Sequence, residues 1–190
     1  MPAKKQITKD MILQAALQLL RTGGFDAVNV KTLAKELHCS TQPVYLSFSS
    51  MDELRQELIP LAVSEFAATL SSRSSDGQVR LYGAEYLTFA ENEPRLFCFL
   101  MMRPNAFTEM KRALSPIIDR SVRELMETYS INIEEADLLH DHLWMHAHGI
   151  ASMIATEFCD WDPAKARRML EECMAVFTAK YSQHEVTQDE

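Results

Sequence analysis

The stretch 30–48 constrains the fold of this chain more than any other. Apolar residues recur at helical spacing through its first half, and the pattern breaks at His38–Cys39. Ser40 can then cap a second helix through its hydroxyl. Pro43 falls in the first turn of that helix, where no intrahelical bond needs its missing N–H. The sequence therefore predicts two short helices joined by a tight turn, with four apolar residues available for burial: Leu33, Leu37, Val44 and Phe48.

The outer side of the second predicted helix carries polar and methyl-bearing side chains near its N-terminus, which suits insertion into a DNA major groove. Gln42 can pair with adenine through two hydrogen bonds, and Thr41 and the Pro43 ring can contact a thymine methyl group. The alternative for Gln42 is a solvated residue of the first turn. Lys31 lies at the N-terminus of the preceding helix, where backbone N–H groups also favour a phosphate. The predicted DNA-binding residues are Lys31, Ser40, Thr41, Gln42, Pro43, Tyr45 and Ser47.

The net charge of −8 is divided unevenly along the chain. Residues 1–50 hold six basic and three acidic residues, a net +3, whereas the remainder holds 13 basic and 24 acidic residues, a net −11. A basic head on an acidic body directs polyanions to one end of the molecule. Lys4 and Lys5 can extend that head as an arm. Ordinary surface charge and a disordered tail are the alternatives for these two features.

The rest of the chain is predicted to be helical as well. Helix starts are marked by cap signals at Thr8, Asn29, Ser50, Asn132 and Asp162. The segment 71–77, SSRSSDG, is the best boundary signal. We therefore expect an all-α chain with a three-helix head over 1–50, a connecting helix and linker over 51–76, and a helical body over 77–190.

Membrane and secretory features are not found in the sequence. No apolar run reaches the roughly 18 residues of a membrane-spanning helix, and residues 1–9 lack the apolar core of a signal peptide. The cysteines are scattered without a CxxC pair, which is typical of reduced thiols in a cytoplasmic protein. They are Cys39, Cys98, Cys159 and Cys173.

A series of short motifs between Met11 and Leu58 extends the pattern around the tight turn. They are Ile12–Ala16, Gly24-Phe25, Leu33-Ala34, Cys39-Ser40, Val44-Tyr45, Phe48 and Asp52–Leu54, followed in the body by Glu93–Phe97, Trp144 and His148-Gly149. With these motifs the chain resembles the TetR/AcrR family of bacterial transcription regulators. The resemblance implies an all-helical homodimer whose heads bind a palindromic DNA operator. It also implies that the body dimerises and binds a small effector molecule that releases the DNA.

Two residues depart from the usual pattern of that family. His38 stands where the turn usually has glycine, and a left-handed backbone costs more for histidine than for glycine. Met51 stands where the family usually has a phosphate-contacting lysine, which should lower the salt slope of DNA binding by about one unit. Tyr45 matches a family position that donates to a phosphate. Its alternative is a ring packed on the core of the head.

Large apolar and aromatic side chains of the body are candidates for the wall of an effector cavity, because methionines adapt to irregular apolar ligands. The candidates are Phe97, Met101, Met102, Phe107, Met126, Met153, Trp144 and His148. Each of them also suits an ordinary core. Mixed histidine and aromatic groups favour an apolar or amphipathic ligand.

A line of small residues on the helix predicted from 132 to about 158 is the candidate dimer interface. Ala147, Ala151 and Ala155 would let a second helix approach closely. With Cys173 and Phe177 of the last helix, they would form a four-helix interface around a twofold axis. The alternative is packing within one subunit.

Histidines on the same predicted helix raise the question of a metal. His142 and His146 are spaced so that both imidazoles could reach one ion, but no HExxH motif or close cysteine pair completes a ligand set. We predict no metal and no cofactor. Two other functions stay open: a small enzyme that uses these histidines, and an interaction module that has lost DNA binding. The lack of a nucleophile–base motif argues against the enzyme.

Overall fold

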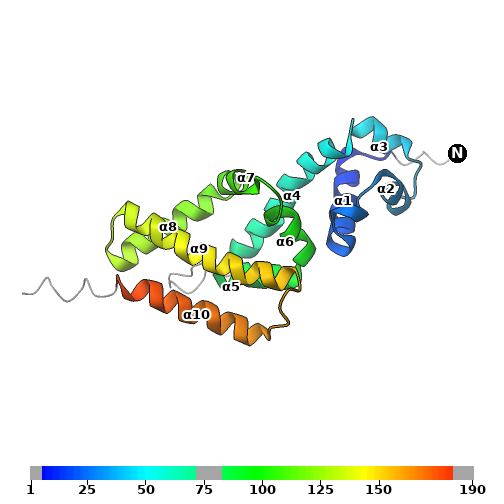
Figure 1. The fold of residues 1–190 in the computed structure, drawn as a ribbon. Helices are drawn as coiled ribbons and strands as arrows, with labels where there is room; N and C mark the ends of the chain where they lie inside the picture. The colour runs from blue at the N-terminus through cyan, green and yellow to red at the C-terminus, as the bar shows by residue number, and fades with distance from the viewer. Residues whose placement is uncertain (1–5, 72–82, 182–190) are drawn as a thin grey trace, which may run out of the picture.

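The computed structural model describes residues 6–71 and 83–181 of the chain, and the regular elements of these residues are all helices (Figure 1). In chain order they are α1 Lys9–Gly23, the 3-10 helix η1 Phe25–Ala27, α2 Val30–Glu36, α3 Gln42–Ser47, α4 Met51–Ser71, α5 Gly83–Asn92, α6 Pro94–Met101, α7 Ala106–Ala113, α8 Ser115–Tyr129, α9 Ile133–Ala155 and α10 Pro163–Ala179. The all-α prediction is confirmed. The predicted arm at Lys4 and Lys5, most of the predicted boundary 71–77, and the polar tail from Ser182 lie outside the described residues.

Four helices of the described chain start at predicted caps, each with a side-chain oxygen that accepts a hydrogen bond from a first-turn backbone N–H. These caps are Thr8, Asn29, Asn132 and Asp162. At α4 the predicted capping box is half present, because Ser50 accepts from the Glu53 N–H at 3.1 Å. The Glu53 carboxylate accepts from the N–H of Ser49 instead of that of Ser50, and its bonds to Ser49 lower the pKa of the Glu53 carboxyl.

Two local predictions differ from the structure. The cap of α3 is Thr41, whose side chain makes no capping bond, so the Ser40 cap is wrong. α7 lies in a segment for which we predicted no helix. Its N-terminal residue Asn105 has a left-handed φ of 59° and no side-chain capping bond, so the usual start signal is missing.

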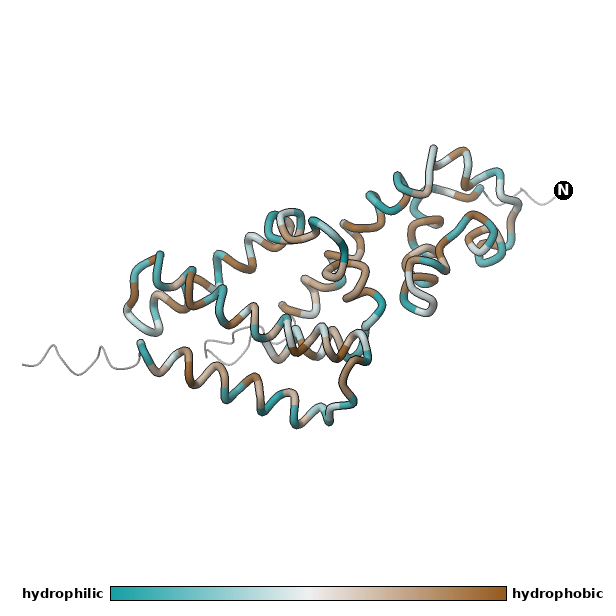
Figure 2. The backbone as a smooth tube through the Cα atoms, in the orientation of Figure 1, coloured by the Kyte–Doolittle hydropathy of each residue, from teal (hydrophilic) through white to brown (hydrophobic). Residues whose placement is uncertain are grey.

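α4 joins the two parts of the fold (Figure 1). The head, α1 to α3, lies at one end, and the body, α5 to α10, lies at the other. Hydrophilic and hydrophobic positions alternate along the helices, as expected for helices that bury one face (Figure 2). One hydrophobic core runs through head and body, and a smaller one lies between α8 and α9. None of the described helices is both long and apolar enough to cross a membrane.

α6 connects the head to the body, since it packs against α1, α4 and α9. The Phe99 ring of α6 stacks on the Phe25 ring of η1, with centroids 5.4 Å apart. Arg21 of α1 forms two ion pairs: its Nη2 lies 2.6 Å from Glu65 of α4, and its Nε lies 3.0 Å from Glu93, which precedes α6. A shift of α6 would therefore be transmitted to the head through packed rings and charged groups.

The line of small residues on α9 is covered within the chain. Ala147, Ala151 and Ala155 are buried in the main core, and α9 packs most extensively against α5. These alanines are therefore not available to a second copy, and their assignment to a dimer interface is wrong. The alternative of packing within one subunit describes them correctly.

Candidate functional site

The two short helices of the head form the predicted helix–turn–helix. Leu33, Val44 and Phe48 are buried between them, and Leu37 is half-buried against the same core. His38 adopts the left-handed conformation expected for the turn, with a φ of 51°. Pro43 lies in the first turn of α3, where it displaces no intrahelical hydrogen bond.

The outer face of α3 is largely exposed. Ser40, Thr41 and Gln42 are exposed, and Pro43 and Ser47 are half-buried. The Tyr45 side chain is 68% exposed, so its ring does not pack on the core of the head.

Leu46 is 80% exposed on the same face, and our sequence analysis missed it. Its position four residues after Gln42, off the face of Val44 and Phe48, is the signal that could have found it.

Lys31 is exposed at the start of α2, but the helix end around it is already capped. The Asn29 side chain accepts hydrogen bonds from the N–H groups of Lys31 and Thr32, both at 3.1 Å. Those N–H groups are therefore not free for a phosphate. Only the charged end of Lys31 remains available to DNA. At α4, Met51 is half-buried against the core instead of facing outward.

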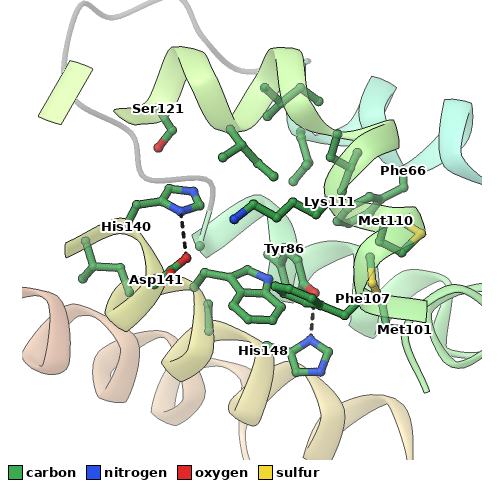
Figure 3. A pocket seen from close by; sticks show the side chains of 18 of the residues that line it. Phe66, Tyr86, Met101, Phe107, Met110, Lys111, Ser121, His140, Asp141 and His148 are labelled. Atoms are coloured by element: carbon green, nitrogen blue, oxygen red, sulfur yellow. Dashed lines mark hydrogen bonds and ion pairs between the residues drawn. The ribbon is translucent and has the colours of Figure 1, made fainter. Parts of the chain in front are cut away.

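The body contains a partly open cavity of about 460 Å³, lined by residues of α4 to α10 (Figure 3). Four of the predicted wall residues line it: Met101, Phe107, Trp144 and His148. Four others lie elsewhere. Phe97 is fully buried behind His148, and Met126 packs in the smaller core. Met102 and Met153 are exposed.

Aromatic groups form one end of the cavity. The Tyr86 hydroxyl and Nδ1 of His148 lie 2.8 Å apart and share a hydrogen bond that joins α5 to α9 (Figure 3). Burial lowers the pKa of His148 and raises the pKa of Tyr86, so both groups are neutral at pH 7. The Trp144 ring stacks on His148 at 5.3 Å and meets Phe107 at 5.5 Å.

Polar groups from three helices form the other end: Ser121 of α8, His140 and Asp141 of α9, and Lys111 of α7 (Figure 3). We did not predict this end. Lys111 lies on the helix that the sequence analysis missed. Ser121 could have been found, because it is a polar residue on the helical face that Val122 and Leu125 bury.

Comparisons with known proteins agree with this arrangement. Residues 12–58, which hold the helix–turn–helix and the start of α4, match the model of the bacterial regulatory proteins of the tetR family. Residues 12–58 therefore form a DNA-binding domain of the tetR-family type. Members of this family are DNA-binding transcriptional regulators, not enzymes, which excludes the enzyme alternative for this protein.

The individual relatives of this chain are distant. An uncharacterised HTH-type transcriptional regulator of Mycobacterium tuberculosis is 22% identical over 169 residues, covering 84% of this chain and 74% of that protein. Two solved structures assigned to the tetR family have a similar fold. The one from Vibrio parahaemolyticus is 20% identical with a TM-score of 0.62, covering 87% of this chain and 95% of its own. The one from Shewanella sp. PV-4 is 21% identical with a TM-score of 0.60, covering 90% and 96%.

The two histidines considered as metal ligands have separate surroundings. The His142 ring stacks on Phe177 of α10 at 5.1 Å, whereas Nε2 of His146 is buried without a hydrogen-bond partner in the described chain. No group of three metal-binding side chains was found among residues 6–71 and 83–181.

Proposed function

We propose that this tetR-family regulator is a cytoplasmic repressor that binds a palindromic operator as a homodimer and is released by a small effector. The observation that carries the proposal is the combination of an exposed polar face on α3 with a cavity in the body. In the proposed division of the chain, residues 1–50 bind DNA, 51–76 connect the two parts, and 77–190 bind the effector and dimerise.

The DNA-binding part of the proposal rests on the exposed outer face of α3. Gln42, Tyr45 and Leu46 all project from the head there, and the basic residues of the chain are in excess only in its first 50 positions. A helix with this face can lie in the major groove, with Gln42 reading a base edge and Tyr45 donating to a phosphate.

The homodimer is supported by an apolar stripe that nothing in the described chain covers. Leu138 and Met145 of α9 are 53% and 51% exposed, and Val176 of α10 is 73% exposed. On α9 the stripe continues to Gly149, where an added Cβ would meet no atom within 4 Å. A twofold axis beside α9 and α10 would bury this stripe against its copy.

The dimer can be tested by measuring its mass in solution. Met145→Glu combined with Val176→Glu should give a folded monomer, because charges would be buried at the interface. Phe158→Glu, which changes an exposed apolar residue outside the stripe, is the matched control and should leave the dimer intact.

Effector release is supported by the position of α6. Its residue Met101 lines the cavity, Phe97 lies against His148, and Phe99 stacks on Phe25 of the head. An effector that prefers one position of α6 would shift the spacing of the two heads. It can reduce DNA occupancy only as far as its affinities for the DNA-binding and the released arrangement differ.

The first test is the selection of bound sequences from random DNA duplexes at near-physiological salt. An inverted repeat with half-sites about one helical turn apart, roughly 34–36 Å, is the expected result. Failure to enrich any motif, with a dimer confirmed by mass, would overturn the DNA-binding role and favour the interaction module.

A further inference from the structure

The cavity of the body has one apolar end and one polar end, and the polar end holds both a hydroxyl group and charged side chains. The inference drawn from them rests on the proposed effector-binding role of this cavity. We propose that the effector is an amphiphile with a carboxylate head group, which Ser121 and Lys111 bind while its apolar part lies against Trp144 and Phe107.

Ser121 is the first observation, because it is a buried polar group without a partner. Its side chain is on the wall of the cavity and the residue is only 2% exposed. None of the hydrogen bonds found within residues 6–71 and 83–181 involves its hydroxyl. Since the hydroxyl lies on the cavity wall and makes no other hydrogen bond in the described chain, it can donate one to an acceptor of a bound ligand.

Lys111 is the second observation, because it brings a positive charge to the same end. Lys111 is exposed, and its side chain extends along one end of the cavity toward His140 (Figure 3). The ammonium group forms no ion pair with the carboxylates of the described chain, and its nearest assigned contact is the Phe107 ring at 6.0 Å. Ser121 and Lys111 together offer hydrogen-bond donors and charge, which a carboxylate accepts.

The other polar groups of this end fit the same ligand. His140 is mostly buried, and burial lowers its pKa, so it adds no positive charge before a ligand binds. Asp141 is the only carboxylate among the residues that line the cavity, and its side chain is 56% exposed. Asp141 and Lys111 are both exposed, but Asp141 already lies 3.8 Å from Nδ1 of His140, whereas Lys111 has no carboxylate partner in the described chain. The group of this end that is left for a ligand is therefore the cation, which an anionic head group can pair with.

The opposite end accounts for the apolar part of the ligand. Phe66, Met101, Met110 and Phe107 line it (Figure 3). The Trp144 ring, 5.5 Å from that of Phe107, lines it as well. The volume of about 460 Å³ lies in the range of small-molecule sites. Tyr86 and His148 already form a hydrogen bond with each other, so this end does not require a second polar group on the ligand.

The experiment compares three probes with one alkyl chain and different head groups: decanoate, decanol and decylamine. Binding is measured below the micelle concentrations by the fluorescence of Trp144, in full-length protein that carries Trp161→Phe so that Trp144 is the single tryptophan. Decanoate should bind about tenfold or more tightly than the other two probes, which corresponds to about 1.4 kcal/mol.

Two variants separate the head-group site from general effects. Lys111→Met should lower the affinity for decanoate about tenfold and leave that for decanol unchanged, and Ser121→Ala should lower it by about threefold to tenfold. Arg112→Met is the matched control: it removes the same charge from the same helix, but Arg112 does not line the cavity. Its decanoate affinity should equal that of the parent protein.

Three results would overturn the inference: equal binding of decanol or decylamine, equal losses in Lys111→Met and Arg112→Met, or no binding of any probe. Operator binding of the same preparations is measured separately, without probe. A protein that binds its operator but shows one of these three results retains the proposed regulatory function and refutes only the carboxylate ligand.

Discussion

Replacement of Gln42 by alanine tests the placement of α3 in the major groove. Gln42 is the first residue of α3 and is exposed, and no hydrogen bond of its side chain is found in the described chain. Alanine has the highest helix propensity, so Gln42→Ala should leave the free energy of unfolding within about 0.5 kcal/mol of the parent. Any effect on DNA binding then reports the DNA contact alone.

The expected loss follows from the number of hydrogen bonds that the side chain can form. A bidentate pair with adenine is worth about 1–3 kcal/mol of discrimination against the wrong base, which is about 5-fold to 150-fold in the dissociation constant. Gln42→Ala should therefore weaken binding to the selected operator by that factor and leave binding to random duplex unchanged. Fluorescence anisotropy at one fixed salt concentration measures both.

Tyr45→Phe provides the contrast for this measurement. It removes only a hydroxyl from a side chain that is 68% exposed, so its loss should be about 0.5–1.5 kcal/mol and the same for operator and random duplex. Equal losses on both duplexes for Gln42→Ala, or no loss for either variant, would show that α3 does not read bases as proposed.

Three further predictions concern the head, the core and the cavity. Lys31→Met should lower the slope of log affinity against log salt by about one unit in a salt titration with operator DNA, because one phosphate contact is lost. An unchanged slope would mean that Lys31 does not contact the DNA backbone. Ala151→Leu should lower the free energy of unfolding by about 1–3 kcal/mol in urea denaturation, because Ala151 lies on α9 and is fully buried. A neutral effect would mean that α9 and α5 can separate. Decanoate affinity should rise as the pH falls toward the pKa of His140. Burial lowers this pKa in the free protein and a bound carboxylate would raise it, so binding takes up a proton. The charges that face His140 are Asp141, Asp137 and Lys111, and the dependence should disappear in His140→Asn.

The head could be predicted almost completely from the sequence because its signals are local. The capping side chains Thr8 and Asn29 act within three residues of their own position. The break in apolar spacing predicted the turn at His38, and the family resemblance implied its left-handed backbone. Even the departure at Met51 has a local explanation, since a methionine can fill the core where a lysine would remain in solvent.

The body could be predicted only in part because its site depends on which helices meet. The apolar face of α9 was recognised, but the sequence does not state whether α5 of the same chain or α9 of a second copy covers Ala151. Likewise, methionine and phenylalanine patterns do not separate the wall of a cavity from a filled core, so Phe97 and Met126 were assigned to the wall together with Met101.

The position of α6 explains why a ligand in the body can act on the head without touching it. Phe99 stacks on the Phe25 ring. The guanidinium group of Arg55, on α4, lies over the same Phe25 ring, 4.1 Å from its centroid. Arg21 is held by carboxylates from two directions, α4 and the start of α6. Both connections join the head to α4 and to α6 at once, so a change in the angle between these two helices must alter at least one of them. Because α6 also contributes Met101 to the cavity wall, occupation of the cavity and orientation of the head are properties of the same packed unit.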